Sequence, residues 1–180
     1  GFATPSGKVE LFSSILEDLG FDPLPYHREG PAISEAYPYR VFTGVREDAF
    51  FQTGQRNIKA LRDRSPSPKL FLHPEDAARE NVQDQDWVRL ETAHGAVTAK
   101  ILVQNSMKSG HIRVPHGWWY PELRSSEHLA GAFISSDAVL CSDEEEFLDY
   151  EQGVPHFKGF PGRIVKIATP LNLSEQTLNG

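Results

Sequence analysis

Apolar and polar positions alternate through residues 87–92 and again through residues 96–103. Alternation with a period of two is typical of β-strands that bury one face. The two segments flank the short stretch Ala93-His94-Gly95, so they predict a β-hairpin. In its second strand four apolar side chains share one face, and we expect that face to point into the core: Val97, Ala99, Ile101 and Val103.

Further strands are predicted by four short segments: residues 39–43, 69–72, 111–114 and 163–167. We expect the first of them to stop at Gly44, and Ser109-Gly110 supplies a turn before the third. The strands are short and closely spaced, with only brief helices between them. This pattern predicts a mainly β fold with α insertions, closed into a barrel rather than left as an open sheet.

The first twenty residues contain a helical pattern that ends at Gly20. Its apolar residues are spaced i, i+3, i+4 and i+7: Phe12, Ile15, Leu16 and Leu19. Residues 21–38 are rich in Pro, Gly and Tyr, which indicates a connector rather than a folded unit.

Two more short helices are expected inside the barrel region. One begins at Pro74, with acidic residues in its first turn, and ends at Asn81, which tolerates a left-handed conformation. Residues 57–62 have room for one or two helical turns. The stretch between residue 121 and the last strand is expected to be irregular, and the acidic run at residues 143–146 is interpreted as a solvated surface.

These elements predict three regions along the chain. Residues 1–37 form an entering helix and connector, residues 38–168 form the β-barrel domain, and residues 169–180 form a polar tail. The chain begins with glycine rather than methionine, so we interpret it as a piece of a longer protein. Catalytic residues absent here would then lie upstream.

Composition narrows the function classes. The 180 residues carry a formal net charge of −7, which argues against a general nucleic-acid or bilayer surface, since such surfaces need clustered Lys and Arg. No apolar run is long enough to span a membrane. Cys141 is the only cysteine, so neither an internal disulfide nor a cysteine-based metal cluster can form, and we interpret it as a half-buried structural thiol.

Motif searches exclude several standard chemistries. The chain has no Gly-rich dinucleotide fingerprint, no phosphate-binding P-loop, no zinc-protease helix and no nucleophile elbow. Its seven histidines are scattered without metal-ligand spacing. We therefore predict no catalytic residue and no metal ligand in this chain.

The segment Thr43-Gly44-Val45-Arg46 is a candidate anion-binding loop. A strand that ends in Thr-Gly exposes backbone N–H groups, and a nearby Arg can fork onto a phosphate. Gln52 and Thr53 add an amide and a hydroxyl, and Arg56 adds a second guanidinium. The same residues also fit an ordinary polar loop whose arginines pair with local acids, and both interpretations stay open on these residues alone.

The loop His116-Gly117-Trp118-Trp119 places two large aromatic residues where loops are normally polar. The rings either plug one end of the barrel or form the wall of a ligand pocket. The two roles are compatible, because one indole can pack inward while the neighbouring backbone lines a ligand groove.

Read in order, these segments resemble the C-terminal molybdopterin dinucleotide-binding domain of the dimethyl sulfoxide reductase superfamily. The resemblance covers roughly residues 1–168 and is carried by a set of short motifs: Thr4-Pro5-Ser6-Gly7-Lys8, Thr43-Gly44, Gln52-Thr53, the Pro66/Pro68 pair, His73-Pro74-Glu75-Asp76-Ala77, Asp84-Gln85-Asp86-Trp87-Val88, Ser109-Gly110 and His116-Gly117-Trp118-Trp119. The superfamily comprises molybdenum and tungsten oxidoreductases, many of which serve anaerobic respiration.

The resemblance implies a double-psi β-barrel that packs over molybdopterin guanine dinucleotide. That cofactor holds molybdenum or tungsten through dithiolenes, while the protein ligand of the metal comes from an earlier domain. The chain is thus expected to be a C-terminal fragment of a larger catalytic subunit, inactive alone, which cradles the cofactor. Its expected partners are the upstream domains of the same subunit and an iron–sulfur electron-transfer subunit. The alternative is a double-psi barrel that acts as an interaction or substrate-recognition module without cofactor.

Matching positions imply a set of cofactor-binding residues. The loop at residues 43–46 and the Gln52-Thr53 pair match segments that contact pterin and pyrophosphate. Relatives often carry His-Ser in place of Gln52-Thr53. Gly117 would let the backbone approach the cofactor closely. Ser136 and Ala138 stand where relatives commonly have two asparagines, and only Ser136 keeps a hydrogen-bonding group. The implied residues are Thr43, Gly44, Val45, Arg46, Gln52, Thr53, His116, Gly117, Trp118, Ser136 and Lys158.

Two further departures from the family pattern lie in surface turns. Asn81 replaces a frequent glycine after the short helix, and Gln85 replaces a common glycine in the following turn. We expect both side chains to be accommodated there.

Overall fold

The computed structural model describes the 180 residues except 28, 124–127, 145–146, 150–152 and 169–180. The predicted polar tail from residue 169 therefore lies outside the described residues. The chain divides into two compact units, Gly1–Gly30 and Pro31–Gly180.

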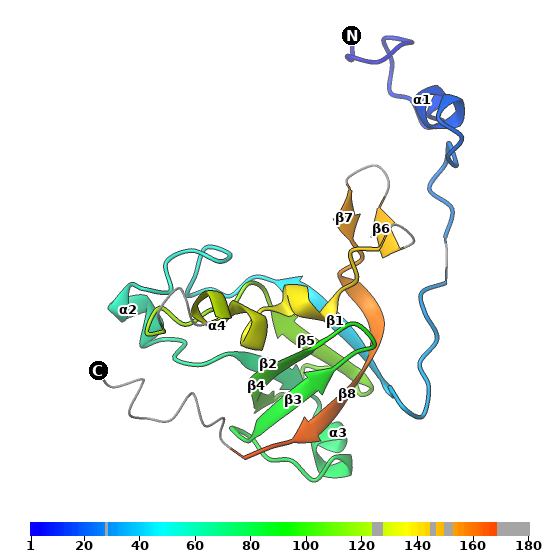
Figure 1. Ribbon diagram of the computed structural model, residues 1–180. Helices are drawn as coiled ribbons and strands as arrows, with labels where there is room; N and C mark the ends of the chain where they lie inside the picture. Colours follow the sequence, from blue (N-terminus) through cyan, green and yellow to red (C-terminus); the bar gives the residue numbers. More distant parts are fainter. Residues whose placement is uncertain (28, 124–127, 145–146, 150–152, 169–180) are drawn as a thin grey trace. The chain divides into compact units, whose positions relative to one another are not determined.

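The second unit is a closed six-stranded barrel (Figure 1). Around the barrel the order is β1-β5-β2-β4-β3-β8, in which β1 pairs with β5 and β2 pairs with β4 in parallel. The bounds are β1 Tyr39–Val45, β2 Lys69–Leu72, β3 Trp87–Glu91, β4 Ala96–Val103, β5 His111–Pro115 and β8 Lys158–Lys166. The predicted double-psi β-barrel with α insertions is confirmed, as is the hairpin of β3 and β4.

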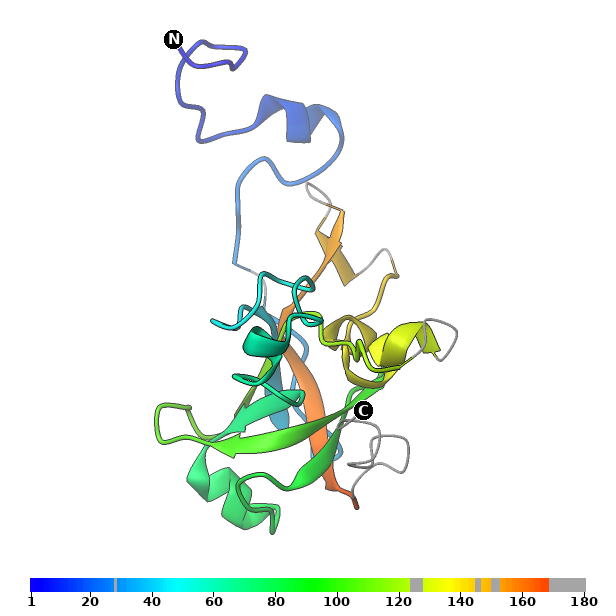
Figure 2. The ribbon, with the colours of Figure 1, turned by 90° about the vertical axis from the view of Figure 1, so that its left-hand side faces the viewer.

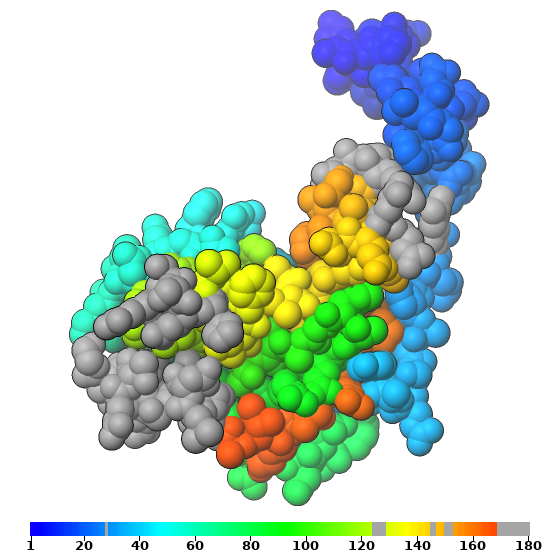
Figure 3. All heavy atoms as spheres, viewed as in Figure 1, coloured from blue at the N-terminus to red at the C-terminus, as the bar shows by residue number. Residues whose placement is uncertain are grey.

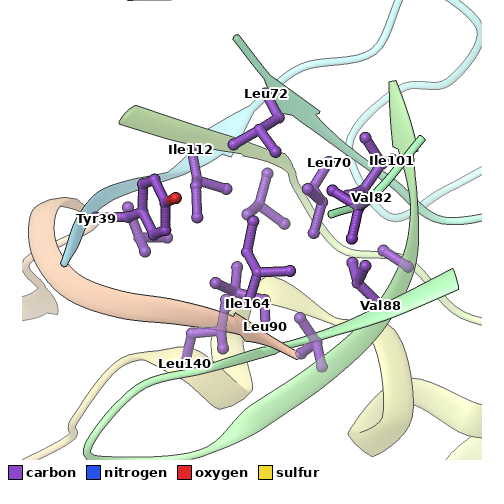
Figure 4. Close-up of a cluster of buried hydrophobic side chains, with 14 of the residues drawn as sticks. Tyr39, Leu70, Leu72, Val82, Val88, Leu90, Ile101, Ile112, Leu140 and Ile164 are labelled. Carbon is purple, nitrogen blue, oxygen red and sulfur yellow. The ribbon is translucent and has the colours of Figure 1, made fainter. Parts of the chain in front are cut away.

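The barrel interior is filled by the inward-facing side chains of these strands (Figure 4). In β4 the expected face is buried at Val97, Ala99 and Ile101, while Val103 is only partly buried at the edge. Tyr39 is the most polar member of this core, and its hydroxyl donates to Glu80 Oε1 at 2.5 Å. A buried hydroxyl needs such an acceptor. The bond to Glu80 therefore lets the Tyr39 ring pack in the core while its hydroxyl stays hydrogen-bonded.

Two strands differ from the sequence prediction. β1 does not stop at Gly44 but continues to Val45, and the pairing register with β5 shifts between Phe42 and Val45. Gly44 has a φ of 73°, which its missing Cβ permits, so the glycine bends the strand instead of ending it. β8 begins at Lys158, earlier than the predicted strand, and pairs with both β1 and β3 to close the barrel.

The helices lie at the two ends of the barrel (Figures 1 and 2). α3 (Pro74–Arg79) is at one end, and α2 (Lys59–Arg62) and α4 (His128–Ser135) are at the other. The expectation of irregular structure after residue 121 was wrong in part, because α4, the 3₁₀ helix η1 (Asp137–Leu140) and a small antiparallel pair, β6 (Leu148–Asp149) with β7 (Val154–Pro155), lie there. In Figure 3 the yellow atoms of this region lie beside the green atoms of the β3–β4 hairpin, and both α4 and η1 contact β4.

The turns around α3 explain the glycines expected in relatives. His73 caps α3 by accepting the backbone N–H of Glu75 at its Nδ1. Asn81 and Gln85 then adopt positive φ angles of 52° and 69°. Both positions need the left-handed conformation that glycine adopts most easily, and here an amide side chain tolerates it.

The first unit contains the predicted helix as α1 (Ser14–Asp18), capped by the Ser13 side chain. None of its residues is buried, and Ile15 within it and Leu19 at its C-cap are exposed. The connector that follows contains no helix or strand among its described residues. Within the described part of the chain, no helix combines the length and apolar character that membrane crossing requires.

Candidate cofactor-binding site

Parallel pairing of β1 with β5 brings two of the predicted loops together. Val45 lies opposite Pro115, and the backbone N–H of His116 donates to the Val45 carbonyl at 2.7 Å. Both strands therefore end at the same edge of the barrel, so the loop at residues 43–46 and the loop at residues 116–118 are neighbours.

The side chain of Asp137 bonds both of these loops. Its side chain is fully buried, and its carboxylate accepts the backbone N–H of Gly44 at 2.9 Å and of Gly117 at 2.8 Å. The same carboxylate lies 3.1 Å from Nδ1 of His116. The Gly44 N–H, considered from the sequence as one donor for an anion, already bonds this internal carboxylate.

Arg56 joins a third segment to the same place. This buried guanidinium donates to the carbonyl oxygens of Gly117 at 3.0 Å, His116 at 2.8 Å and Gln52 at 3.2 Å, and it pairs with Glu47 at 3.3 Å. Burial lowers its pKa, and the Glu47 carboxylate opposes that effect. Of the two interpretations that the sequence left open for Arg56, the structure favours pairing with a local acid, since its donors face the protein interior.

Close packing keeps Thr53 against the glycine of the aromatic loop. A Cβ built on Gly117 would lie 2.3 Å from Thr53 Cγ2, and the φ of Gly117 is 67°. The indole N–H of Trp119 donates to the Thr53 carbonyl at 2.6 Å. Gln52 and Thr53 are nevertheless exposed to solvent beside the loop that contains Gly117.

The two tryptophans have different roles. Trp118 is 2% exposed and packs with Phe50 and Tyr120 in a cluster separate from the barrel core, so it does not plug the barrel. Two guanidinium groups contact its ring, with the Cζ of Arg56 at 4.5 Å and the Cζ of Arg62 at 4.6 Å from the ring centroid. The Trp118 ring has almost no surface left to contact a ligand.

Thr43, Ser136 and Lys158 complete the set. Thr43 is buried, and both its N–H and its hydroxyl donate to the Phe157 carbonyl, at 2.8 Å and 3.0 Å. Lys158 follows that carbonyl and pairs with Phe42 in the β1–β8 ladder. Ser136 immediately precedes Asp137 and is partly exposed. The structure thus brings all the sequence-predicted segments to one end of the barrel, although Thr43 contributes to packing rather than to the exposed surface.

Two residues of this region were missed from the sequence. Asp137 carried no signal beyond its place beside Ser136, and Arg62 had none beyond its place at the end of the short helical segment 57–62. Arg62 forms an ion pair with Glu122 at 3.0 Å, although burial lowers its pKa. Cys141 is half-buried as expected, its Sγ lies 3.9 Å from the Thr43 hydroxyl, and burial raises the pKa of its thiol.

A cavity of about 460 Å³ adjoins the candidate site where β1 and β5 end. Its charged lining residues are Arg46, Glu47, Asp48, Arg64, Lys69 and Arg113. The carboxylate of Glu47 is already bonded by Arg56, Lys69 and Ser65. Among the other charged residues that line the cavity, arginines are the most numerous. Arg46 belongs to both the cavity and the predicted loop, which gives that loop a cationic side.

The described residues include no group of three or more His, Cys, Asp or Glu side chains arranged to hold a metal ion. Of the acidic run, Asp143 and Glu144 are exposed, while Glu145 and Glu146 lie outside the described residues. The charged groups that converge at the candidate site are therefore Asp137, Arg56 and the outward-facing Arg46 and Lys158.

Comparison with known proteins identifies relatives of the whole arrangement. Residues 41–147, more than half of the chain, match the family described as "Molydopterin dinucleotide binding domain". The chain is 40% identical over 168 residues to acetylene hydratase of Syntrophotalea acetylenica, covering 88% of this chain and 23% of the relative. It is 30% identical over 183 aligned positions to dopamine dehydroxylase of Eggerthella lenta, covering 96% of this chain and 17% of the relative.

The solved structure of acetylene hydratase from Pelobacter acetylenicus has the same fold over 93% of this chain and 24% of that chain, with a TM-score of 0.84 and 39% identity. The chain thus spans about a quarter or less of the length of these relatives. The family match includes the strand and loop segments that meet at Asp137, and it does not favour an interaction module without cofactor. The chain belongs to the molybdopterin dinucleotide-binding domain family of the dimethyl sulfoxide reductase superfamily.

Proposed function

We propose that the end of the barrel around Asp137 binds molybdopterin guanine dinucleotide within a larger molybdenum or tungsten enzyme. The observation that carries the proposal is the convergence of separate segments there: the loop at residues 43–46, Gln52-Thr53, the loop at residues 116–118, Ser136 and Lys158. These segments lie far apart in the sequence, yet Asp137 and Arg56 bond three of them together.

The exposed groups fit a ligand that combines a polar ring with a diphosphate. Arg46 and Lys158 are exposed cations, and Gln52 and Thr53 are exposed hydrogen-bonding residues. Guanidinium and ammonium groups bind phosphate oxygens through charge-assisted hydrogen bonds. Gly44 is also exposed, and its missing side chain leaves the backbone open to close approach.

When bound, the cofactor supplies the metal chemistry, while this chain binds and orients it. Arg46 and Lys158 are proposed to hold the diphosphate, and Gln52 and Thr53 to bond polar edges beside it. His116 presents its imidazole, while Gly117 and Trp118 are buried and support the loop that carries it. Where relatives commonly have two asparagines, Ser136 would contact the cofactor through its hydroxyl. Ala138, at the second of these positions, has no side-chain group that can form a hydrogen bond.

The proposed binding domain spans residues 38–168, with residues 1–37 leading into it from the preceding part of the subunit. The large fraction of the relatives that lies outside this chain supports the proposal that upstream domains complete the cradle and supply the metal ligand. For an oxidoreductase of this kind, an iron–sulfur electron-transfer subunit is the proposed redox partner. Similarity to acetylene hydratase also makes a hydration a candidate reaction for the larger protein.

Calorimetric titration with GDP and with extracted cofactor tests the proposal. We expect binding that weakens about tenfold when Arg46 is changed to Gln, because one charge-assisted hydrogen bond is lost. The change Gln52→Ala should weaken it less. Both side chains are exposed, so neither change should alter the fold.

Lys59→Gln is the matched control, because Lys59 is an exposed cation whose ion pair is with Asp63 on its own helix. It removes the same charge without touching the candidate site. Equal weakening by R46Q and K59Q would mean that binding follows net charge alone. Absence of binding to either ligand by the protein would contradict the proposal.

A further inference from the structure

His116 and Asp137 form a contact that fixes the hydrogen-bonding state of the histidine. The carboxylate lies 3.1 Å from Nδ1 of His116, on a side chain that keeps about a third of its surface exposed. Among the residues that the structure describes, no hydrogen-bond partner reaches the other ring nitrogen, Nε2. The imidazole is therefore held at one nitrogen and open at the other.

Both carboxylate oxygens of Asp137 accept hydrogen bonds. Two backbone N–H groups, from Gly44 and Gly117, donate to the two carboxylate oxygens. Hydrogen bonds donated to a carboxylate stabilise the ionised state, and an ionised carboxylate can only accept. Nδ1 of His116 must then carry the proton that forms this contact. In the neutral ring Nε2 is left as an acceptor.

We propose that Asp137 is a positioning residue for the cofactor surface: it sets the tautomer of His116 so that Nε2 accepts a hydrogen bond from an N–H of the bound pterin. The inference rests on the proposed function for its ligand, but the tautomer belongs to this chain alone. Asp137 also couples this orientation to the backbone, since the carboxylate that holds the ring holds Gly44 and Gly117 as well.

Asp76 provides a matched comparison within the same chain. It is also fully buried, and it accepts the backbone N–H of Gly110 at 2.7 Å, the Ser109 hydroxyl at 2.9 Å and Arg79 at 2.8 Å. It is thus a buried carboxylate that fixes a glycine turn, with no histidine among these partners. The changes D137N and D76N each remove one charge from a fully buried carboxylate that accepts a glycine N–H, and only Asp76 also pairs with an arginine.

The first experiment reads the tautomer directly, from long-range ¹H–¹⁵N spectra of the protein labelled with ¹⁵N-histidine, at a pH where the ring is neutral. The variant H116Q assigns the His116 signals. We expect the Nδ1–H tautomer in the unsubstituted protein and in D76N. In D137N the asparagine can donate to Nδ1, so we expect a switch to the Nε2–H tautomer. An Nε2–H tautomer in the unsubstituted protein, or no switch in D137N, would overturn the inference.

The second experiment measures the affinity of the same variants for extracted cofactor. We expect D137N to bind about tenfold more weakly than D76N, because the switched ring offers a donor where an acceptor is needed. If the tautomer switches while affinity stays equal, His116 does not serve the cofactor and the positioning role is overturned. If the unsubstituted protein shows the Nδ1–H tautomer but binds no cofactor, it is the proposed function that fails, and the ligand part of this inference fails with it.

Discussion

The carboxylate of Asp137 accepts the backbone N–H of Gly117 at 2.8 Å, in a place where no solvent reaches it. The other oxygen accepts the N–H of Gly44, so one buried side chain joins the loops that follow two neighbouring strands. A buried carboxylate is stable only when its oxygens are bonded, and backbone donors fix its position closely. The two loops therefore cannot move independently while this contact holds.

Replacing Arg56 by Lys should destabilise the protein strongly. The guanidinium of Arg56 bonds three carbonyl oxygens and one carboxylate, and a lysine ammonium cannot reproduce that planar fork. Breaking a buried ionic network in this way costs about 3 kcal/mol in the free energy of unfolding. Urea denaturation followed by circular dichroism measures the loss. R46Q, at an exposed arginine ten residues earlier, should change this free energy by less than about 0.5 kcal/mol.

The two adjacent tryptophans should respond differently to substitution. Trp118 packs against two guanidinium groups and Phe50, so W118A should cost about 3–5 kcal/mol of stability. Trp119 is only partly buried, and W119F, which removes its N–H bond to Thr53, should cost about 1 kcal/mol. Thermal unfolding of both variants provides the comparison. Equal losses would contradict the separate roles of the two rings.

The sequence predicted the barrel well because its strands follow a local rule. Alternation places Val97, Ala99 and Ile101 on one face, and no distant information is needed to see that. The ordered motifs likewise led to the segments that meet at the candidate site. The sequence left open whether Gly44 and Arg56 bind an anion or internal partners, because it does not show which distant acceptors fold against them.

Asp137 illustrates the limit most clearly. It stands 93 residues after Gly44 and 20 after Gly117 along the chain, and no local pattern marks a carboxylate as buried. Its role follows only from the tertiary contacts. The left-handed residues were easier to interpret: Asn81 and Gln85 occupy turns whose geometry explains the glycines common in relatives.

The thiol of Cys141 should react slowly with iodoacetamide in the folded protein. Burial raises its pKa, so less of the reactive thiolate is present at neutral pH than in the unfolded chain. The folded state holds the proton more tightly, so the contribution to stability is fully present below the unfolded pKa and is lost as pH rises through the folded pKa. Mass spectrometry of the alkylated protein, with and without urea, tests this. The measurement runs from about pH 7 to about pH 10, a range that brackets the usual pKa of a thiol. Equal rates in both states would contradict it.

Gly117→Ala tests whether the aromatic loop depends on close contact with Thr53. The new methyl group would lie 2.3 Å from Thr53 Cγ2, and the φ of 67° adds a conformational cost. Gly110→Ala is the matched control, because Gly110 has a φ of 80° but a Cβ added there would meet no atom within 4 Å. We expect G110A to cost about 1–2 kcal/mol from backbone conformation alone, and G117A to cost more.

The double change G117A/T53S separates the two causes, because serine lacks the methyl group that the alanine would strike. Its stability should return to about the level of G110A and no further, since the left-handed backbone cost of about 1–2 kcal/mol remains. Urea unfolding of the unsubstituted protein and the three variants gives the comparison. If T53S restores nothing, the contact between the two loops is not what makes glycine necessary at residue 117. If it does restore stability, the 53 and 117 segments are held in register by packing as well as by Arg56.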